Sequence, residues 1–202
     1  MTVKLVGSTS GSVSLQAPAS TTGGAHRVLT LPDVDGTIAT TTTGGKLLQV
    51  VSTTKTDTAS QTIAAGATGN DITGLTVSIT PSNANNKIYL TCTLSASASS
   101  LGMSFYKDGS ILSGATGDAS GSKARIFATY YGAGYQLVPS TIQYLDTAGG
   151  TSAITYSIRI FNSNTFSITT AINYNSTARS AFGAGTLDYV GASTITAMEI
   201  AA

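Results

Sequence analysis

From residue 46 onward, apolar and polar residues alternate along the sequence with a period of two. The clearest segment is 154–160, in which isoleucine and tyrosine occupy the even positions and threonine, serine and arginine the odd ones. Alternation of this kind places successive side chains on opposite faces of a β-strand. It is typical of antiparallel sheets that bury one face, since strands buried on both faces have continuous apolar runs. The pattern therefore predicts an all-β fold.

The amino-acid composition favours the same fold class. Residues that stabilise helices are scarce: Glu199 is the only glutamate, and charged residues make up 9% of the chain, against roughly 25% in an ordinary soluble domain. Threonine, serine and β-branched aliphatic residues dominate instead, with 22 glycines among them. Hydrophobic residues still reach 41%, which is enough to bury a core.

We expect about nine strands in residues 46–202, a spacing that suits an antiparallel β-sandwich of the jelly-roll kind. Their expected ranges are 47–51, 72–80, 87–94, 101–107, 125–131, 135–145, 153–161, 166–174 and 193–200. Asp108 and Gly109 predict a tight turn after the fourth of these strands. The segments 113–124 and 175–192 are rich in glycine, alanine and serine, and we expect them to be loops that contact partners.

Residues 1–45 differ from the rest of the chain. They contain short alternating pieces between clusters of serine, threonine and glycine, and such pieces are too sparse to form a core of their own. The apolar residues of these pieces are Val3, Leu5, Val13, Leu15, Leu29 and Leu31. We expect residues 1–45 to form an extended arm whose short strands become ordered on another chain or surface. Residues 46–202 then form the sandwich.

The charge and the hydropathy of the chain exclude several classes of partner. The formal net charge is +1, which is too small for a basic patch that neutralises several phosphates, so we expect no nucleic-acid partner. No run of 18 apolar residues is present, so we expect no membrane insertion. The N-terminus lacks the apolar segment of a signal peptide, and we expect synthesis in the cytoplasm without export.

Groups for catalysis or metal binding are rare in the sequence. His26 is the only histidine and lies in the arm, where nothing holds a catalytic base in place. Cys92 is the only cysteine, so neither an internal disulfide nor a thiolate metal site is available. Asp33 and Asp35 resemble the start of a calcium loop, but the later oxygen ligand and the bidentate glutamate are absent. We therefore expect no catalytic, cofactor-binding or metal-binding residues, and we do not expect an enzyme.

Tyrosine is the enriched aromatic residue, with nine copies against five phenylalanines. Tyr130, Tyr131 and Tyr135 lie close together in the sequence. A tyrosine side chain offers a large contact area with a polar tip, which suits both wet protein interfaces and stacking against sugars. These three residues are candidate contacts, either with a neighbouring subunit or with a glycan.

Two parts of the sequence resemble bacteriophage virion proteins. The arm segments 7–18 (GSTSGSVSLQAP) and 29–38 (LTLPDVDGTI) are similar to a segment that recurs before the distal domain of phage fibre and structural proteins. Farther along, 106–109 (YKDG), 155–160 (TYSIRI) and 193–200 (STITAMEI) resemble the β-sandwich tips of short phage fibres and of head-decorating proteins.

The resemblance implies a structural protein of the virion surface that is made in the host cytoplasm and assembles as a homotrimer. We expect a capsid decoration or cement protein on the capsid exterior, because no shaft repeats or coiled-coil heptads are present to project a tip far from the particle. In this interpretation the six apolar arm residues anchor the chain to the major capsid protein or another virion protein. The alternative is a short tail fibre or tail-tip adhesin that binds a host surface receptor or glycan.

Overall fold

The structure is a computed structural model that describes residues 2–6, 12–16, 46–97, 100–130, 136–175 and 189–202. The chain divides into two compact units, Met1–Gly44 and Gly45–Ala202. In the described ranges the secondary structure consists of β-strands and one short 3₁₀ turn, Ser113–Ala115, with no α-helix. The all-β fold class that the alternation predicts is confirmed.

The N-terminal unit contains an antiparallel hairpin of β1 (Thr2–Val6) and β2 (Ser12–Gln16). The two strands pair over their whole lengths, from Thr2 opposite Gln16 to Val6 opposite Ser12. The sequence predicts pairing with another chain, whereas in the structure the two strands pair with each other. A two-stranded hairpin is marginally stable by itself in water. That this segment needs a partner surface therefore stays a prediction.

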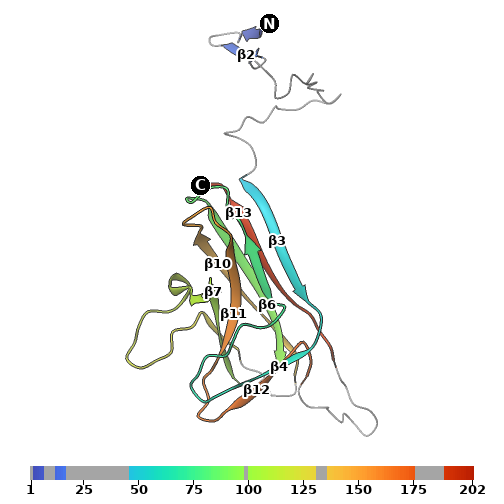
Figure 1. The fold of residues 1–202 in the computed structure, drawn as a ribbon, viewed down its shortest axis with the longest axis vertical. Helices are drawn as coiled ribbons and strands as arrows, with labels where there is room; N and C mark the ends of the chain where they lie inside the picture. Colours follow the sequence, from blue (N-terminus) through green and yellow to red (C-terminus); the bar gives the residue numbers. More distant parts are fainter. Residues whose placement is uncertain (1, 7–11, 17–45, 98–99, 131–135, 176–188) are drawn as a thin grey trace. The chain divides into compact units, whose positions relative to one another are not determined.

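The larger sheet of the C-terminal unit has six strands. They are β3 (Leu47–Lys55), β4 (Ala59–Ile63), β6 (Lys87–Ser97), β10 (Val138–Thr147), β12 (Ile168–Ile172) and β13 (Ser193–Ile200). The strand β6 lies in the middle, since β10 pairs along one side of it and β13 and then β12 pair along the other. Beyond β13 lies β3, and beyond β12 lies β4, each antiparallel to its neighbour (Figure 1).

The smaller sheet has five strands. They are β5 (Thr76–Ile79), β7 (Leu101–Lys107), β8 (Ser110–Ile111), β9 (Ala128–Tyr130) and β11 (Ile154–Asn162). The strand β11 pairs with β5 on one side and with β7 on the other, and β8 and β9 pair with opposite ends of β7. Asp108 and Gly109 adopt positive φ angles of 48° and 77° between β7 and β8. The predicted tight turn is therefore confirmed, with the backbone of a type I′ hairpin.

The two sheets pack together through their apolar sides and enclose one core. Leu90 of β6, Phe105 of β7 and Ile158 of β11 are fully buried in it. The alternation at 154–160 holds for its apolar residues, all of which are buried. Ser157 is buried as well, because its hydroxyl donates a hydrogen bond to Asp71 Oδ1 at 2.6 Å. The antiparallel β-sandwich is confirmed.

The described part of the C-terminal unit has eleven strands, where the sequence predicts about nine. The additional strand β4 escapes prediction because Gln61 stands between Ala59 and Ile63 on its inward side and interrupts the apolar alternation. The predicted strand 125–131 is reduced to the three residues of β9 in the described residues. The difference in number comes from two short additional strands, β4 and β8.

Candidate functional site

The structure describes four of the six predicted anchoring residues and brings them together in the N-terminal hairpin. The register places Val3 opposite Leu15 and Leu5 opposite Val13. Outside the described residues lie Leu29 and Leu31. That any of these residues contacts a partner stays a prediction.

The three predicted tyrosine contacts are not brought together in the described part of the chain. Tyr130 ends β9, where its backbone pairs with Leu101 of β7, whereas Tyr131 and Tyr135 lie outside the described residues. A different tyrosine lies on the outer side of the smaller sheet: Tyr106 of β7 stacks against the guanidinium of Arg159 at 4.3 Å. Tyrosine enrichment points to contact residues in general, but only the strand register identifies this one.

The described residues contain no group of three or more His, Cys, Asp or Glu side chains that could hold a metal ion. The sequence candidates His26, Asp33 and Asp35 lie outside the described ranges. Cys92 is buried in the core, and burial raises the pKa of its thiol to about 12. A thiol with so high a pKa stays protonated at neutral pH and is a poor nucleophile.

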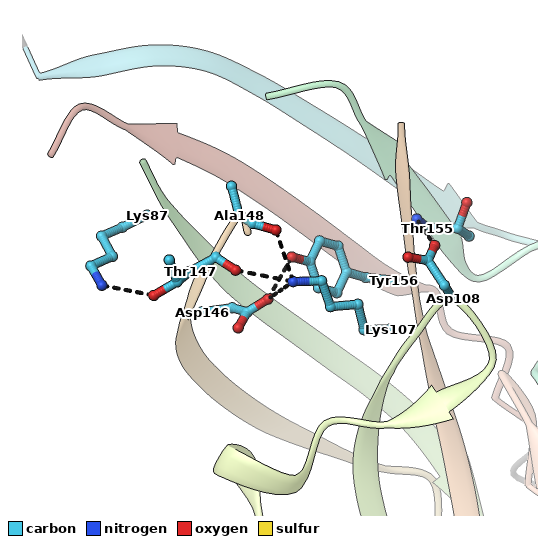
Figure 2. A network of polar contacts seen from close by, with 8 residues as sticks. All are labelled: Lys87, Lys107, Asp108, Asp146, Thr147, Ala148, Thr155 and Tyr156. Atoms are coloured by element: carbon cyan, nitrogen blue, oxygen red, sulfur yellow. Dashed lines mark hydrogen bonds and ion pairs between the residues drawn. The ribbon is translucent and has the colours of Figure 1, made fainter. Parts of the chain in front are cut away.

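Charged and polar side chains join the two sheets beside β10 (Figure 2). Lys107 of β7 donates hydrogen bonds from Nζ to Asp146 Oδ2 at 2.8 Å, to the carbonyl oxygen of Thr147 at 3.0 Å and to that of Ala148 at 3.1 Å. Tyr156 of β11 donates from its hydroxyl to the same Asp146 oxygen at 2.8 Å. We call Lys107, Asp146 and Tyr156 the inter-sheet network.

The inter-sheet network has the residue types of an acid–base site but lacks the properties of one. Lys107 directs its three ammonium hydrogens to three acceptors, so no donor is left for a substrate. Burial and the hydrogen bond to Asp146 raise the pKa of Tyr156, whereas a nucleophilic phenolate needs a lowered one. The network instead holds β10 of the larger sheet against β7 and β11 of the smaller one.

Outward-facing residues of β3, β13, β6 and β10 align in rows across the larger sheet. One row is apolar and consists of Val50, Met198, Tyr89 and Leu145, each opposite the next. Half of the surface of two members is exposed, 52% for Val50 and 50% for Leu145. Leu48, two positions before Val50 on β3, adds another exposed apolar side chain. Exposed apolar side chains that lie together on an outer face make this row a candidate contact surface for another protein.

The next two rows consist of hydroxyl and amide side chains. Their members are Ser52, Thr196, Thr91 and Gln143 in one row and Thr54, Thr194, Thr93 and Thr141 in the other. Neighbouring hydroxyls hydrogen-bond to each other, at 2.8 Å between Ser52 and Thr196 and at 2.8 Å between Thr93 and Thr141. We call the three rows together the large-sheet face. None of its members is charged, and Lys87 lies in the row on the other side of the apolar row.

Sequence reasoning misses the large-sheet face. Alternation places Val50, Tyr89 and Met198 on the outer sides of their own strands, but the row exists only because strands distant in sequence become neighbours. The one local signal is a Thr–x–Thr pattern, which occurs at 91–93 and again at 194–196. That pattern indicates a polar strand face without showing which strands it adjoins.

A cavity of about 140 Å³ opens on the outer side of the smaller sheet. Tyr106 of β7 and Arg159 of β11 line it, and the segment after the 3₁₀ turn adds Arg125. We call it the arginine cavity. Arg159 donates hydrogen bonds to Asp71, from Nε to Oδ1 at 2.8 Å and from Nη2 to Oδ2 at 3.4 Å. These bonds, helped by one from Ser157, hold the pKa of Asp71 below its usual value.

Within the described ranges, no helix is long and apolar enough to span a bilayer. The sequence matches no protein-family model and no curated protein. What the chain does must therefore be inferred from its residues and its fold.

Proposed function

We propose that the chain is a structural protein of a bacteriophage virion, a capsid decoration or cement protein that sits on the capsid exterior. The observation that carries this proposal is the large-sheet face. A sandwich that presents half-exposed Val50 and Leu145 beside two rows of uncharged polar side chains offers neighbouring proteins a surface that is apolar along one row and rich in hydroxyls next to it. The resemblance of segments 7–18 and 29–38 to phage virion proteins suggests the kind of neighbour.

The edges of the larger sheet support assembly of the protein into a homotrimer. The strands β3 and β10 have nine and ten residues, and in the described part of the chain each pairs with a strand on one side only. Open edges of this length invite pairing with another chain, so native proteins cover or interrupt them. A closed threefold assembly covers such edges with neighbouring copies.

In this proposal the N-terminal unit anchors the sandwich to the major capsid protein or another virion protein. The register of the hairpin places Val3 opposite Leu15 and Leu5 opposite Val13. Burial of each such side chain against a partner contributes roughly 1.5–3 kcal/mol, and a trimer engages three hairpins at once. The chain acts mechanically, by bridging neighbouring capsid proteins, and not as an enzyme.

The experiment that tests the proposal is a measurement of copy number on purified virions of the phage that encodes the chain, by quantitative mass spectrometry. We expect a fixed ratio to the major capsid protein. A variant that lacks residues 2–38 keeps a folded sandwich and is lost from the particles. Absence of the intact chain from virions overturns the proposal, and full retention of the shortened variant overturns the anchoring role of the hairpin.

A second candidate function is that of a short tail fibre or tail-tip adhesin that binds a host receptor or glycan. The arginine cavity favours it, because a cavity with two arginines and a tyrosine is suited to a small polar ligand. The same measurement separates the two candidates. A few copies per particle, confined to the tail, select the adhesin.

A further inference from the structure

The arginine cavity lies between the strands β7 and β11 and residues 124–127, which we call the covering segment. Ser104 of β7 is directly opposite Arg159 of β11, and Gly102 is directly opposite Phe161, so these positions form a continuous floor. The covering segment is fixed to this floor by hydrogen bonds from the backbone N–H of Phe127 to the carbonyl oxygen of Met103 at 2.9 Å and to Ser104 Oγ at 3.3 Å. The cavity is therefore formed by the sheet together with residues 124–126, which hydrogen bonds of the neighbouring Phe127 fix to β7.

Arg159 is held in one orientation. Asp71 accepts hydrogen bonds from its Nε and Nη2, and the guanidinium stacks on the Tyr106 ring at 4.3 Å. The remaining nitrogen, Nη1, has no hydrogen-bond partner among the described residues. A guanidinium fixed in this way presents a free donor edge without losing further side-chain freedom when an anion binds.

Positive charge is concentrated at this place. Arg125 lines the same cavity and donates from Nε to the carbonyl oxygen of Gly117 at 2.7 Å. An adjoining cavity of about 630 Å³, which also contacts Ile126 and Phe161, is lined by Lys123. Among the described residues that line the two cavities there is no carboxylate. Because Asp71 pairs with Arg159 beside the cavity, Arg125 and Lys123 supply the net positive charge of the lining.

The remaining lining groups are hydroxyls and apolar surfaces. Thr68 and Ser104 are among the residues that line the arginine cavity, and Ser122 and Ser163 are among those that line the adjoining one. Phe161 lies between the two and is partly exposed. An aromatic surface beside hydroxyls fits the apolar face and the hydroxyl groups of a sugar ring. A simple inorganic anion would leave these groups without a role.

We propose that the arginine cavity binds an acidic sugar, a hexose residue that carries a carboxylate. The carboxylate faces Arg159 and Arg125, which provide charged donors to it. The ring lies along Phe161, and its hydroxyls contact Thr68 and Ser104. The site is independent of where the protein sits on a virion, so it can be tested on the purified chain.

The test uses the full-length chain and two sugars that differ only at C6, galacturonate and galactose, in titrations followed by saturation-transfer difference NMR. We expect saturable binding of galacturonate and at least about tenfold weaker binding of galactose, because charged hydrogen bonds are lost. Arg125→Gln weakens galacturonate binding about tenfold. The matched control Lys87→Gln removes one positive charge from the larger sheet and leaves binding unchanged.

Equal binding of the two sugars, no binding of galacturonate, or unchanged binding by Arg125→Gln overturns the proposal. Binding of inorganic sulfate as tight as that of galacturonate also overturns it, since the sugar ring then contributes nothing. Because Arg159 also stabilises the sheet surface, Arg159→Lys is measured beside Arg125→Gln, with thermal unfolding as a check on folding. The lysine variant keeps the charge but loses the fixed donor edge, and we expect weaker binding from a folded protein. None of these outcomes alters the copy number on virions, so this proposal and the virion role fail separately.

Discussion

The two outer faces of the sandwich are built from the same alternation and differ in nearly every property. The large-sheet face carries an apolar row and two rows of hydroxyl and amide side chains, without a charge. The outer side of the smaller sheet carries Arg159 and Asp71 and is partly covered by the segment that contains Arg125. The two proposals follow this difference, with a protein partner for the large-sheet face and a small charged ligand for the arginine cavity.

One glycine explains how the smaller sheet acquires its cover. A Cβ at Gly102 of β7 would lie 2.9 Å from Ile126 Cδ1 and 3.2 Å from Phe161 Cβ. The absence of a side chain at Gly102 leaves the space that the Ile126 side chain of the covering segment occupies. On the larger sheet, the corresponding outward positions carry full side chains such as Tyr89 and Thr91. That face stays open among the described residues.

We expect the largest difference between the two faces when a charge is introduced into the apolar row, because assembly should then be lost. Leu145→Lys leaves the monomer folded, because half of the Leu145 surface is exposed. In a protein interface the new charge is buried without a partner, which costs roughly 2–5 kcal/mol of association free energy. We expect loss of the trimer in light scattering, with a mass that falls toward the 20.3 kDa of one chain, and loss of binding to particles.

The matched control for that variant is Ile111→Lys, which places the same charge on β8 of the smaller sheet at a residue that is 42% exposed. We expect the assembly state to stay unchanged. If both variants dissociate the protein equally, or if neither does, the proposal that the large-sheet face is the assembly surface is wrong.

The fold class is predictable from the sequence because alternation within each strand is a local pattern. The candidate functional surfaces are not predictable, because they depend on which distant segments become neighbours. Alternation within 154–160 is enough to place Tyr156 and Ile158 inside. The row Val50–Met198–Tyr89–Leu145 depends on three strand registers between distant segments. The same holds for the pairing of Arg159 with Asp71, which lies far from it in the sequence. The periodicity of the sequence does not show which distant residues become neighbours.

The tyrosine prediction illustrates the same limit. Clustering in sequence selects Tyr130, Tyr131 and Tyr135, of which the structure describes only the backbone of the first. Tyr106 and Tyr156 instead make the interactions that the described residues show, with Arg159 and with Asp146. Which tyrosine stacks on a cation or donates to a carboxylate depends on the neighbouring strands. Composition therefore indicates which residue types form contacts, but not where in the fold these contacts lie.

Acid is expected to weaken the larger sheet through Glu199, the inward carboxylate of β13. Burial alone would raise the pKa of Glu199, but hydrogen bonds from Asn86, Gln49 and Ser82 outweigh it and lower the pKa from 4.5 to about 2. Because the folded pKa is below the unfolded one, this stabilisation is complete above about pH 4.5 and is lost as the pH falls to about 2. The loss amounts to about 3 kcal/mol, measured by denaturant unfolding across this range.

The variant Glu199→Gln isolates this contribution. At neutral pH the glutamine keeps the shape of the side chain, and its oxygen can still accept from Asn86 and Ser82 in place of Oε1. Its NH2 group replaces Oε2, which accepts a hydrogen bond from Gln49 Nε2 at 2.6 Å, and so brings two donors together. We expect it to be less stable than the native chain at pH 7 and equally stable near pH 2. A native chain that loses no more stability between pH 4.5 and pH 2 than Glu199→Gln would show that the carboxylate does not hold the sheet.

The smallest expected effects on stability come from removing single pairs of hydrogen-bonded hydroxyls. Such a pair of the same length can be removed from either outer face. Thr93 pairs with Thr141 at 2.8 Å on the large-sheet face, and Thr155 pairs with Ser78 at 2.8 Å on the outer side of the smaller sheet. Thr93→Val and Thr155→Val each remove one exposed cross-strand hydrogen bond, worth less than about 1 kcal/mol. We expect both melting temperatures to fall by less than about 4 °C in differential scanning calorimetry.

The two hydroxyl variants should differ only when the protein is assembled. Thr93 lies on the large-sheet face, four residues along β6 from Tyr89 of the apolar row, so a change in its polarity alters the proposed contact surface. Thr155 lies on the other sheet, outside that face. We therefore expect Thr93→Val alone to change the trimer dissociation constant. A fall in monomer stability several times larger for Thr93→Val would mean that the threonine rows hold the sheet itself together. The large-sheet face would then be a structural element of the sandwich and not its contact surface.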